Sequence, residues 1–121
     1  MLDRLVGPPG LAGEALHQAM EEHAGQYVCV VEGAIPRKDG GIYCKVGGKT
    51  AIDSLNEVAE KAGAIIAIGS CASFGGIPAA EPNPTSARSV ADLITDKPII
   101  NVPGCPPIPM VITGVLTHFL T

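Results

Sequence analysis

Hydrophobic positions along the chain follow two patterns: short continuous apolar runs, and segments in which apolar residues recur at helical spacing. Three short, almost continuously apolar runs occur at residues 27–31, Ala64–Ile68 and Ile99–Val102. Runs of this kind are typical of strands buried on both faces of a parallel sheet. Apolar residues between these runs recur at helical spacing. They predict helices over residues 11–24, from Thr50 to about Lys61, over residues 87–94 and over residues 111–120, with Pro109 at the first helical position.

Local signals define where several of these elements begin and end. Thr50 and Asp53 resemble a capping box in which Asp replaces the usual Glu, and Lys61 with Gly63 forms a stop signal. The connections at residues 33–49 and 69–85 are rich in Gly and Pro and are predicted to be long shaped loops. Long ordered loops in compact domains are usually functional.

Strands and helices alternate three times, which predicts an α/β fold with a parallel sheet and right-handed crossovers. We expect residues 1–10 to form an irregular arm and residues 11–121 to form one domain. Three strands make a thin sheet. The sheet is therefore expected to be incomplete, with a remaining strand outside this chain or supplied by a partner.

The composition and motifs of the chain argue against several classes of function. The net charge of −4 and the aromatic content of 3% argue against nucleic-acid binding, so a protein partner is expected. No glycine cluster has the spacing of a phosphate loop, which argues against a nucleotide site. No apolar stretch is long enough to cross a bilayer, and the first residues resemble neither a signal peptide nor a twin-arginine leader.

Two cysteines carry the candidate chemistry. Cys71 and Cys105 each follow a predicted strand within a Gly- and Pro-rich turn, and Glu32 stands at the exit of the first strand. The carboxyl ends of parallel strands meet at one edge of a sheet, where sites assemble. Thiolates are the preferred ligands of iron–sulfur clusters. The pattern favours a metal cluster at this edge over a plain pair of thiols in tight turns.

The other polar residues near this edge have either two possible roles, one at the cluster and one structural, or a structural role alone. Ser70 and Ser73 flank Cys71 and either donate hydrogen bonds to cluster sulfur or satisfy the turn backbone. Glu32 is either a solvated acid that ends its strand or a residue that lies near the cluster or at a subunit contact. Cys29 is not expected to be a ligand, because it lies within a predicted strand as a core residue, whereas Cys44 lies in the long loop and could approach this edge. His17, His23 and His118 are interpreted as solvated or core histidines, and a disulfide framework is not expected.

Six motifs, taken together, resemble the small, electron-transferring subunit of nickel–iron hydrogenases, in the order and near the spacing of that family. They are Val31-Glu32-Gly33-Ala34-Ile35-Pro36, Gly41-Ile42-Tyr43-Cys44, Gly47-Gly48-Lys49-Thr50, Ile68-Gly69-Ser70-Cys71-Ala72-Ser73-Phe74-Gly75-Gly76, Pro82-Asn83-Pro84-Thr85 and Val102-Pro103-Gly104-Cys105-Pro106-Pro107-Ile108-Pro109. The resemblance implies a flavodoxin-like domain, with helices on both faces of its sheet, that carries a proximal [4Fe–4S] cluster. It also implies a large-subunit partner that holds the nickel–iron centre and a downstream electron acceptor.

The resemblance covers only the central part of such a subunit. Two of the family's four proximal-cluster ligands match Cys71 and Cys105. The other two belong to a Cys-x-x-Cys motif that would precede everything present here, and the C-terminal cluster region is also missing. We therefore expect a fragment, a wrongly placed start or a split polypeptide, inactive alone. By resemblance the complete complex is membrane-associated or periplasmic.

Two rival functions remain open at this point. The cluster subunit of NADH:quinone oxidoreductase has similar Gly-Ser-Cys-Ala and Pro-Gly-Cys-Pro-Pro turns, although Glu32-Gly33 and Pro82-Asn83-Pro84-Thr85 favour a hydrogenase. The second rival is a cluster-free domain that serves as a binding or scaffold module.

Overall fold

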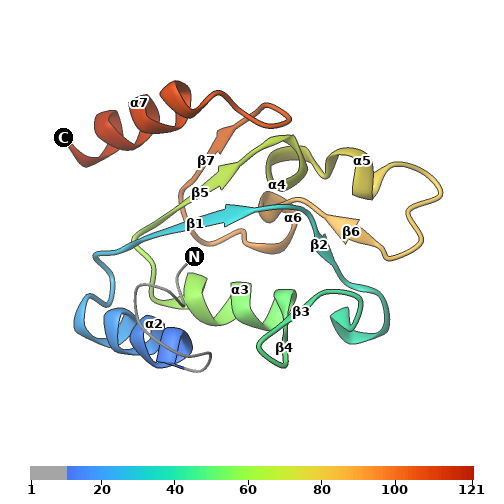
Figure 1. The fold of residues 1–121 in the computed structure, drawn as a ribbon, viewed down its shortest axis with the longest axis horizontal. Coiled ribbons are helices and arrows are strands. Elements are labelled where there is room, and N and C mark those ends of the chain that lie inside the picture. The colour runs from blue at the N-terminus through green and yellow to red at the C-terminus, as the bar shows by residue number, and fades with distance from the viewer. Residues whose placement is uncertain (1–10) are drawn as a thin grey trace.

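A computed structural model describes residues 11–121, so the predicted N-terminal arm lies outside the described residues. Three parallel strands and the helices between them organise this part of the chain (Figure 1). The elements in order are α2 (Leu11–Glu22), β1 (Val28–Glu32), β2 (Ile35–Pro36), η1 (Lys38–Gly41), β3 (Lys45–Val46), β4 (Lys49–Thr50), α3 (Ala51–Glu60), β5 (Ala64–Ile68), α4 (Ser70–Phe74), α5 (Gly76–Ala79), β6 (Ala87–Arg88), α6 (Val90–Leu93), β7 (Ile99–Val102) and α7 (Pro109–Leu120).

The sheet has the order β1-β5-β7, and both pairs of neighbours run parallel. The register places Glu32 beside Ile68 and Ile68 beside Val102. The predicted second and third strands are confirmed at both ends, and the first is shifted by one residue. Continuous apolar runs identified these strands well because both faces of the central strand are buried.

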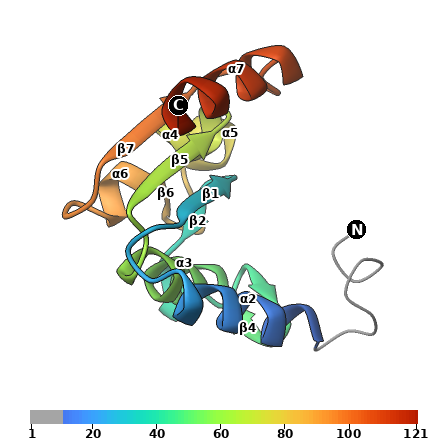
Figure 2. The ribbon, with the colours of Figure 1, turned by 90° about the vertical axis from the view of Figure 1, so that its left-hand side faces the viewer.

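Helices cover both faces of the sheet, which confirms the predicted α/β architecture. Alternate strand residues, such as Cys29, Ile65 and Ala67, form one core with Leu55 and Ala59 of α3. Residue Ile100 of β7 faces the other way and lines a hollow against α7. Figure 2 shows α7 on one side of the sheet and α2 with α3 on the other.

Predicted signals at two helix starts are confirmed. The Thr50 side chain accepts a hydrogen bond from the Asp53 N–H at 3.2 Å, so one of the free donors at the start of α3 is satisfied. Pro109 begins α7, where its missing N–H costs nothing.

The predictions for the long connections were wrong in detail. Residues 69–85 were predicted to be loop but contain α4 and α5, and residues 33–49 contain three short strands or helical turns. The predicted helix over residues 87–94 starts instead as strand β6, which pairs with β2, and only α6 is helical. Ser89 caps α6 by accepting from the Asp92 N–H. Elements this short are decided by partners distant in sequence, which no local period reveals.

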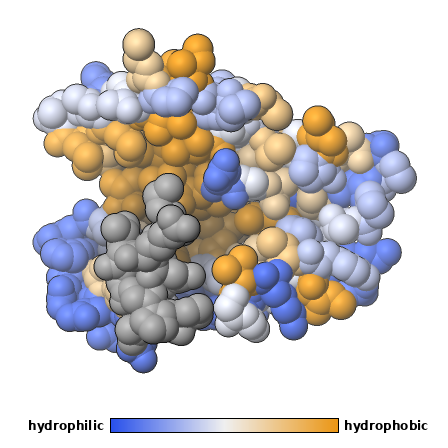
Figure 3. Space-filling model, viewed as in Figure 1, coloured by the Kyte–Doolittle hydropathy of each residue, from blue (hydrophilic) through white to orange (hydrophobic). Residues whose placement is uncertain are grey.

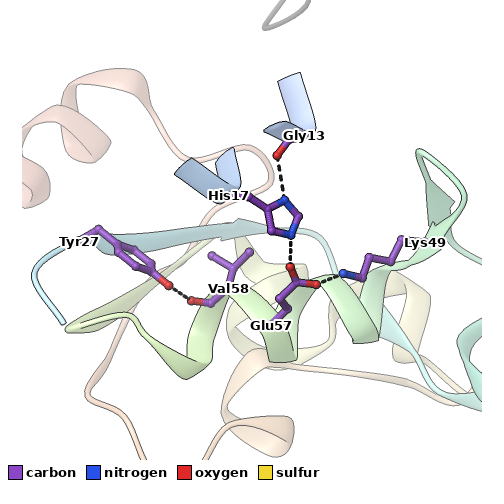
Figure 4. A network of polar contacts seen from close by, with 6 residues as sticks. All are labelled: Gly13, His17, Tyr27, Lys49, Glu57 and Val58. Atoms are coloured by element: carbon purple, nitrogen blue, oxygen red, sulfur yellow. Dashed lines mark hydrogen bonds and ion pairs between the residues drawn. The ribbon is translucent and has the colours of Figure 1, made fainter. Parts of the chain in front are cut away.

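Polar contacts fasten α2 to α3 (Figure 4). His17 of α2 contacts the Glu57 carboxylate of α3 through Nε2, and Lys49 forms an ion pair with the same carboxylate. Tyr27 donates its hydroxyl hydrogen to the Val58 carbonyl. Since His17 and Glu57 are partly exposed, these contacts orient α2 more than they stabilise the fold.

One edge of the sheet is open and apolar. A recess of about 540 Å³ runs along β1, and Figure 3 shows the hydrophobic surface hollowed between α7 and α2. Val30, in the middle of β1, is 50% exposed, whereas its neighbour Ile66 on β5 is 1% exposed. We call this hollow the β1 recess; it is lined by Leu16, Ala19, Met20, residues 27–32, Ile35, Val46, Ala51, Ser54, Leu55 and Val58. An apolar strand edge of this size is typical of a surface that another protein segment covers.

Candidate metal centre

The sheet register brings the two candidate cysteines to equivalent positions. Ile68 and Val102 form the last paired row of β5 and β7, and Cys71 and Cys105 each stand three residues beyond that row. Glu32 ends β1 in the same row. The structure therefore places all three residues at the carboxyl edge of the sheet, as the sequence predicted.

The two cysteine loops are hydrogen-bonded to each other. The Gly69 N–H donates to the Val102 carbonyl at 2.7 Å, and the Ser70 N–H donates to the Gly104 carbonyl at 2.8 Å. The Gly104 N–H in turn donates to the Ser70 hydroxyl oxygen at 3.0 Å. Backbone pairing thus continues past the strand ends, and it holds the loops side by side.

Cys71 lies in the first turn of α4, where it is partly exposed, and Cys105 is exposed. Gly76 packs directly against Cys71: a Cβ at position 76 would lie 2.9 Å from the Cys71 Sγ, and the φ angle of Gly76 is +59°. Any side chain at this position would displace the sulfur. The Gly75-Gly76 pair is visible in the sequence, but only the structure shows that a side chain at position 76 would collide with the Cys71 sulfur.

The polar candidates around Cys71 differ in their contacts. Ser73 is buried and donates its hydroxyl hydrogen to the Ala67 carbonyl at 3.2 Å, so it satisfies the backbone. Ser70 instead accepts a hydrogen bond from the neighbouring loop. Glu32 is exposed and lines the β1 recess.

The other two cysteines lie elsewhere. Cys29 is in the middle of β1, 7% exposed, and it packs into the core, where burial raises the pKa of its thiol. Cys44 lies between η1 and β3, and its carbonyl accepts from the Ala51 N–H at 2.8 Å. All four cysteines are free thiols.

The donor set of the described residues fits part of a cluster. Thiols are the right chemistry for iron, and Cys71 and Cys105 are both accessible to it. Within residues 11–121, however, no three or more His, Cys, Asp or Glu side chains gather as a metal-binding group. A cubane cluster takes four cysteine ligands, so this part of the chain does not complete the site.

Large apolar side chains flank both cysteine loops. Phe74 and Ile77 follow Cys71, Ile108 and Met110 follow Cys105, and all four are exposed. Exposed apolar groups at a functional edge are typical of a protein-protein contact.

We predict that thiol alkylation will follow this geometry. With iodoacetamide at pH 8 on the folded chain, Cys105 should react first and Cys29 last. The reason is that Cys29 is buried and the raised pKa of its thiol leaves less of the reactive thiolate at that pH. Peptide mass spectrometry after timed quenching measures the order. Rapid labelling of Cys29 in folded protein would contradict the structure.

Within the described residues, no helix combines the length and the apolar character needed to cross a bilayer.

Comparisons with known proteins identify the family of this chain. The sequence model of the family described as NADH ubiquinone oxidoreductase, 20 Kd subunit, matches residues 5–119. The uptake hydrogenase small subunit of Azotobacter vinelandii is 50% identical over 120 residues, which is 98% of this chain and 34% of the relative. The hydrogenase-2 small chain of Escherichia coli K12 is 49% identical over 108 residues, or 89% of this chain and 29% of the relative.

Solved structures show the same fold. The Ni-Fe-Se hydrogenase of Desulfomicrobium baculatum superposes with a TM-score of 0.88 at 35% sequence identity, over 95% of this chain and 47% of that one. The chain spans about a third of the length of the curated relatives that it matches. The resemblance to hydrogenase small subunits is thus confirmed, and the chain belongs to the family described as NADH ubiquinone oxidoreductase, 20 Kd subunit.

Proposed function

We propose that this chain is the proximal-cluster part of a nickel–iron hydrogenase small subunit, which relays electrons between a hydrogen-activating large subunit and an acceptor. In this role Cys71 and Cys105 supply two of the four thiolate ligands of a [4Fe–4S] cluster. The cluster, when bound, supplies one-electron transfer. Splitting of H2 belongs to the large subunit, so the isolated chain is expected to be inactive.

The observation that carries this proposal is the position of the two thiols. They stand at equivalent places beyond neighbouring strands, on loops that hydrogen-bond to each other. Gly76 leaves room at the Cys71 sulfur, which a larger residue would fill. The small residues and the hydrogen bonds around these thiols favour a bound inorganic group over two unrelated surface cysteines.

The remaining ligands come, in this proposal, from a polypeptide segment outside the described residues. The open β1 recess ends at Glu32, in the same row as the strand ends that lead to Cys71 and Cys105. A segment that covers this recess would reach the cysteine edge. Glu32 is exposed there, which fits a contact with that segment or with the partner subunit.

The partner surface follows from the exposed apolar side chains. Phe74, Ile77, Ile108 and Met110 surround the cysteine loops, and a large subunit that covers them would also exclude water from the cluster. We place the complete assembly at the membrane or in the periplasm, following the resemblance, with a separate carrier protein as the downstream acceptor.

The test is to purify the tagged chain anaerobically from its source cells, together with whatever subunits it binds. Acid-labile sulfide should reach at least about four atoms per chain, and iron should exceed it because the nickel–iron centre of the large subunit adds iron but no labile sulfide. Reduction should produce the electron paramagnetic resonance signal of a [4Fe–4S] cluster. The complex should reduce a dye with H2 as the electron donor.

Other results would favour the rival functions. Dye reduction that depends on NADH and not on H2 would identify the respiratory oxidoreductase as the parent complex. A colourless, iron-free complex that remains intact would favour the scaffold module, and it would overturn the electron-relay proposal.

A further inference from the structure

One of the hydrogen bonds between the two cysteine loops depends on a side chain. Ser70 immediately precedes Cys71, and Gly104 immediately precedes Cys105. These two residues exchange hydrogen bonds: the Ser70 N–H donates to the Gly104 carbonyl at 2.8 Å, and the Gly104 N–H donates to the Ser70 hydroxyl oxygen at 3.0 Å. The first bond is made by backbone atoms and needs no particular side chain. The second exists only because residue 70 carries a hydroxyl.

Only glycine fits at position 104 of this contact. Its φ angle is +135°, and a Cβ at this position would lie 2.5 Å from the Pro107 Cα. The two loops also approach closely, since a Cβ at Gly69 would lie 3.5 Å from the Gly104 carbonyl oxygen. The Gly104 N–H therefore donates to the Ser70 oxygen where the two loops lie in contact, one residue before each cysteine.

No other polar side chain among the site candidates has this contact. The Ser73 hydroxyl hydrogen is directed to the Ala67 carbonyl within its own segment, and Glu32 is exposed on β1. Of the side-chain hydrogen bonds in the described part of the chain, the one accepted by Ser70 joins the segment that carries Cys71 to the segment that carries Cys105.

We propose that Ser70 is a positioning residue, whose hydroxyl oxygen clamps the Cys105 loop to the Cys71 loop and presets the spacing of the two thiols. This inference rests on the proposed function of these thiols as ligands of one inorganic group. A preset pair loses less conformational freedom when it binds, so the clamp strengthens binding without touching the bound group. Ser70 acts through the Gly104 backbone and is not itself a ligand.

The first arm of the test measures the clamp alone. Amide hydrogen exchange is followed by NMR on the full chain carrying Ser70→Ala, with Ser70→Thr as the matched variant that keeps the hydroxyl. Loss of one hydrogen bond should speed exchange at the Gly104 amide about fivefold in the alanine variant. The Gly69 amide, which donates to the Val102 carbonyl, is the internal control and should not change.

The second arm measures the spacing of the thiols with phenylarsine oxide. This reagent forms two arsenic–sulfur bonds with a pair of thiols, and the arsenic-bound oxygen leaves with the two thiol hydrogens as one water, without oxidation or reduction. All variants carry Cys44→Ser, and the buried Cys29 is retained. Ser70→Ala should weaken arsenical binding about fivefold and Ser70→Thr less than twofold, while Cys105→Ala should abolish two-thiol binding.

Each result is decisive. Unchanged exchange at Gly104 in the alanine variant would overturn the clamp, and changed exchange with unchanged arsenical affinity would overturn its positioning role. If the chain with Ser70 intact binds no arsenical through Cys71 and Cys105, the positioning role is overturned, whereas the proposed function is judged separately by the iron and sulfide content of the purified complex. Far-ultraviolet circular dichroism of each variant verifies that the fold is retained.

Discussion

Replacing Cys105 by alanine is expected to weaken cluster binding by at least about tenfold and so to lower the cluster content of the purified complex. Loss of a residue that merely orients a ligand typically costs 10–100-fold in metal affinity, and loss of a ligand itself costs at least as much. Cys105 is exposed, so the substitution removes a donor without opening a cavity in the core. Iron and acid-labile sulfide per chain, measured after anaerobic purification, give the result.

Cys44→Ser is the matched control for this prediction. Cys44 is also a free thiol outside the core, but it lies between η1 and β3, where its carbonyl accepts a hydrogen bond from the Ala51 N–H at the start of α3. Its replacement should leave the iron content unchanged. Equal iron content in the Cys105 variant and the unaltered protein would show that Cys105 is not a ligand, and it would remove half of the proposed donor pair.

Replacing Ile65 by alanine is expected to lower the free energy of unfolding by about 2–5 kcal/mol. Ile65 is fully buried in β5, where it packs in the core beside Leu55 and Ala59 of α3. The truncation removes apolar area and leaves a cavity beneath the helix, which the rigid strand cannot fill. Urea unfolding, followed by circular dichroism, measures the change from the shift in midpoint.

Val30→Ala tests whether this loss depends on burial. Val30 lies on β1, but its side chain is half-exposed at the β1 recess, and Val30→Ala removes two carbons where Ile65→Ala removes three. This truncation should therefore cost less than about 1 kcal/mol. Similar losses for the two variants would mean that β1 is covered in solution, for example by a second copy of the chain. The concentration dependence of the unfolding midpoint would then reveal that association.

Much of the fold was predictable because its main elements carry local signals. The run Ala64–Ile68 became β5 with the predicted bounds, since a strand buried on both faces needs apolar residues at every position. The run Ile99–Val102 became β7 with the predicted bounds, although β7 lies at the edge of the sheet and its Asn101 is exposed. Thr50 and Pro109 marked helix starts through hydrogen-bonding and backbone rules that act within one turn.

The short elements were not predictable in the same way. Ala87 and Arg88 pair with Ile35 and Pro36, which lie about fifty residues earlier in the chain, and this pairing replaces the helical start that the local spacing indicated. Asn83 supports the turn before β6 by accepting from the Ala87 N–H and donating to the Ala87 carbonyl. Such contacts are chosen by distant partners, so a window of neighbouring residues does not contain them.

For the candidate site, the sequence predicted which residues are involved and roughly where they lie. It did not predict the strand register or the contacts between the two cysteine loops. Cys71 and Cys105 could be placed after strands because apolar runs precede them directly. Only the tertiary structure determined that Ile68 pairs with Val102, which places the two cysteines at equivalent positions beyond their strands. It also determined that the Ser70 hydroxyl accepts a hydrogen bond from the Gly104 N–H. Register and loop contacts depend on how separate segments pack together, and packing is a property of the whole tertiary structure.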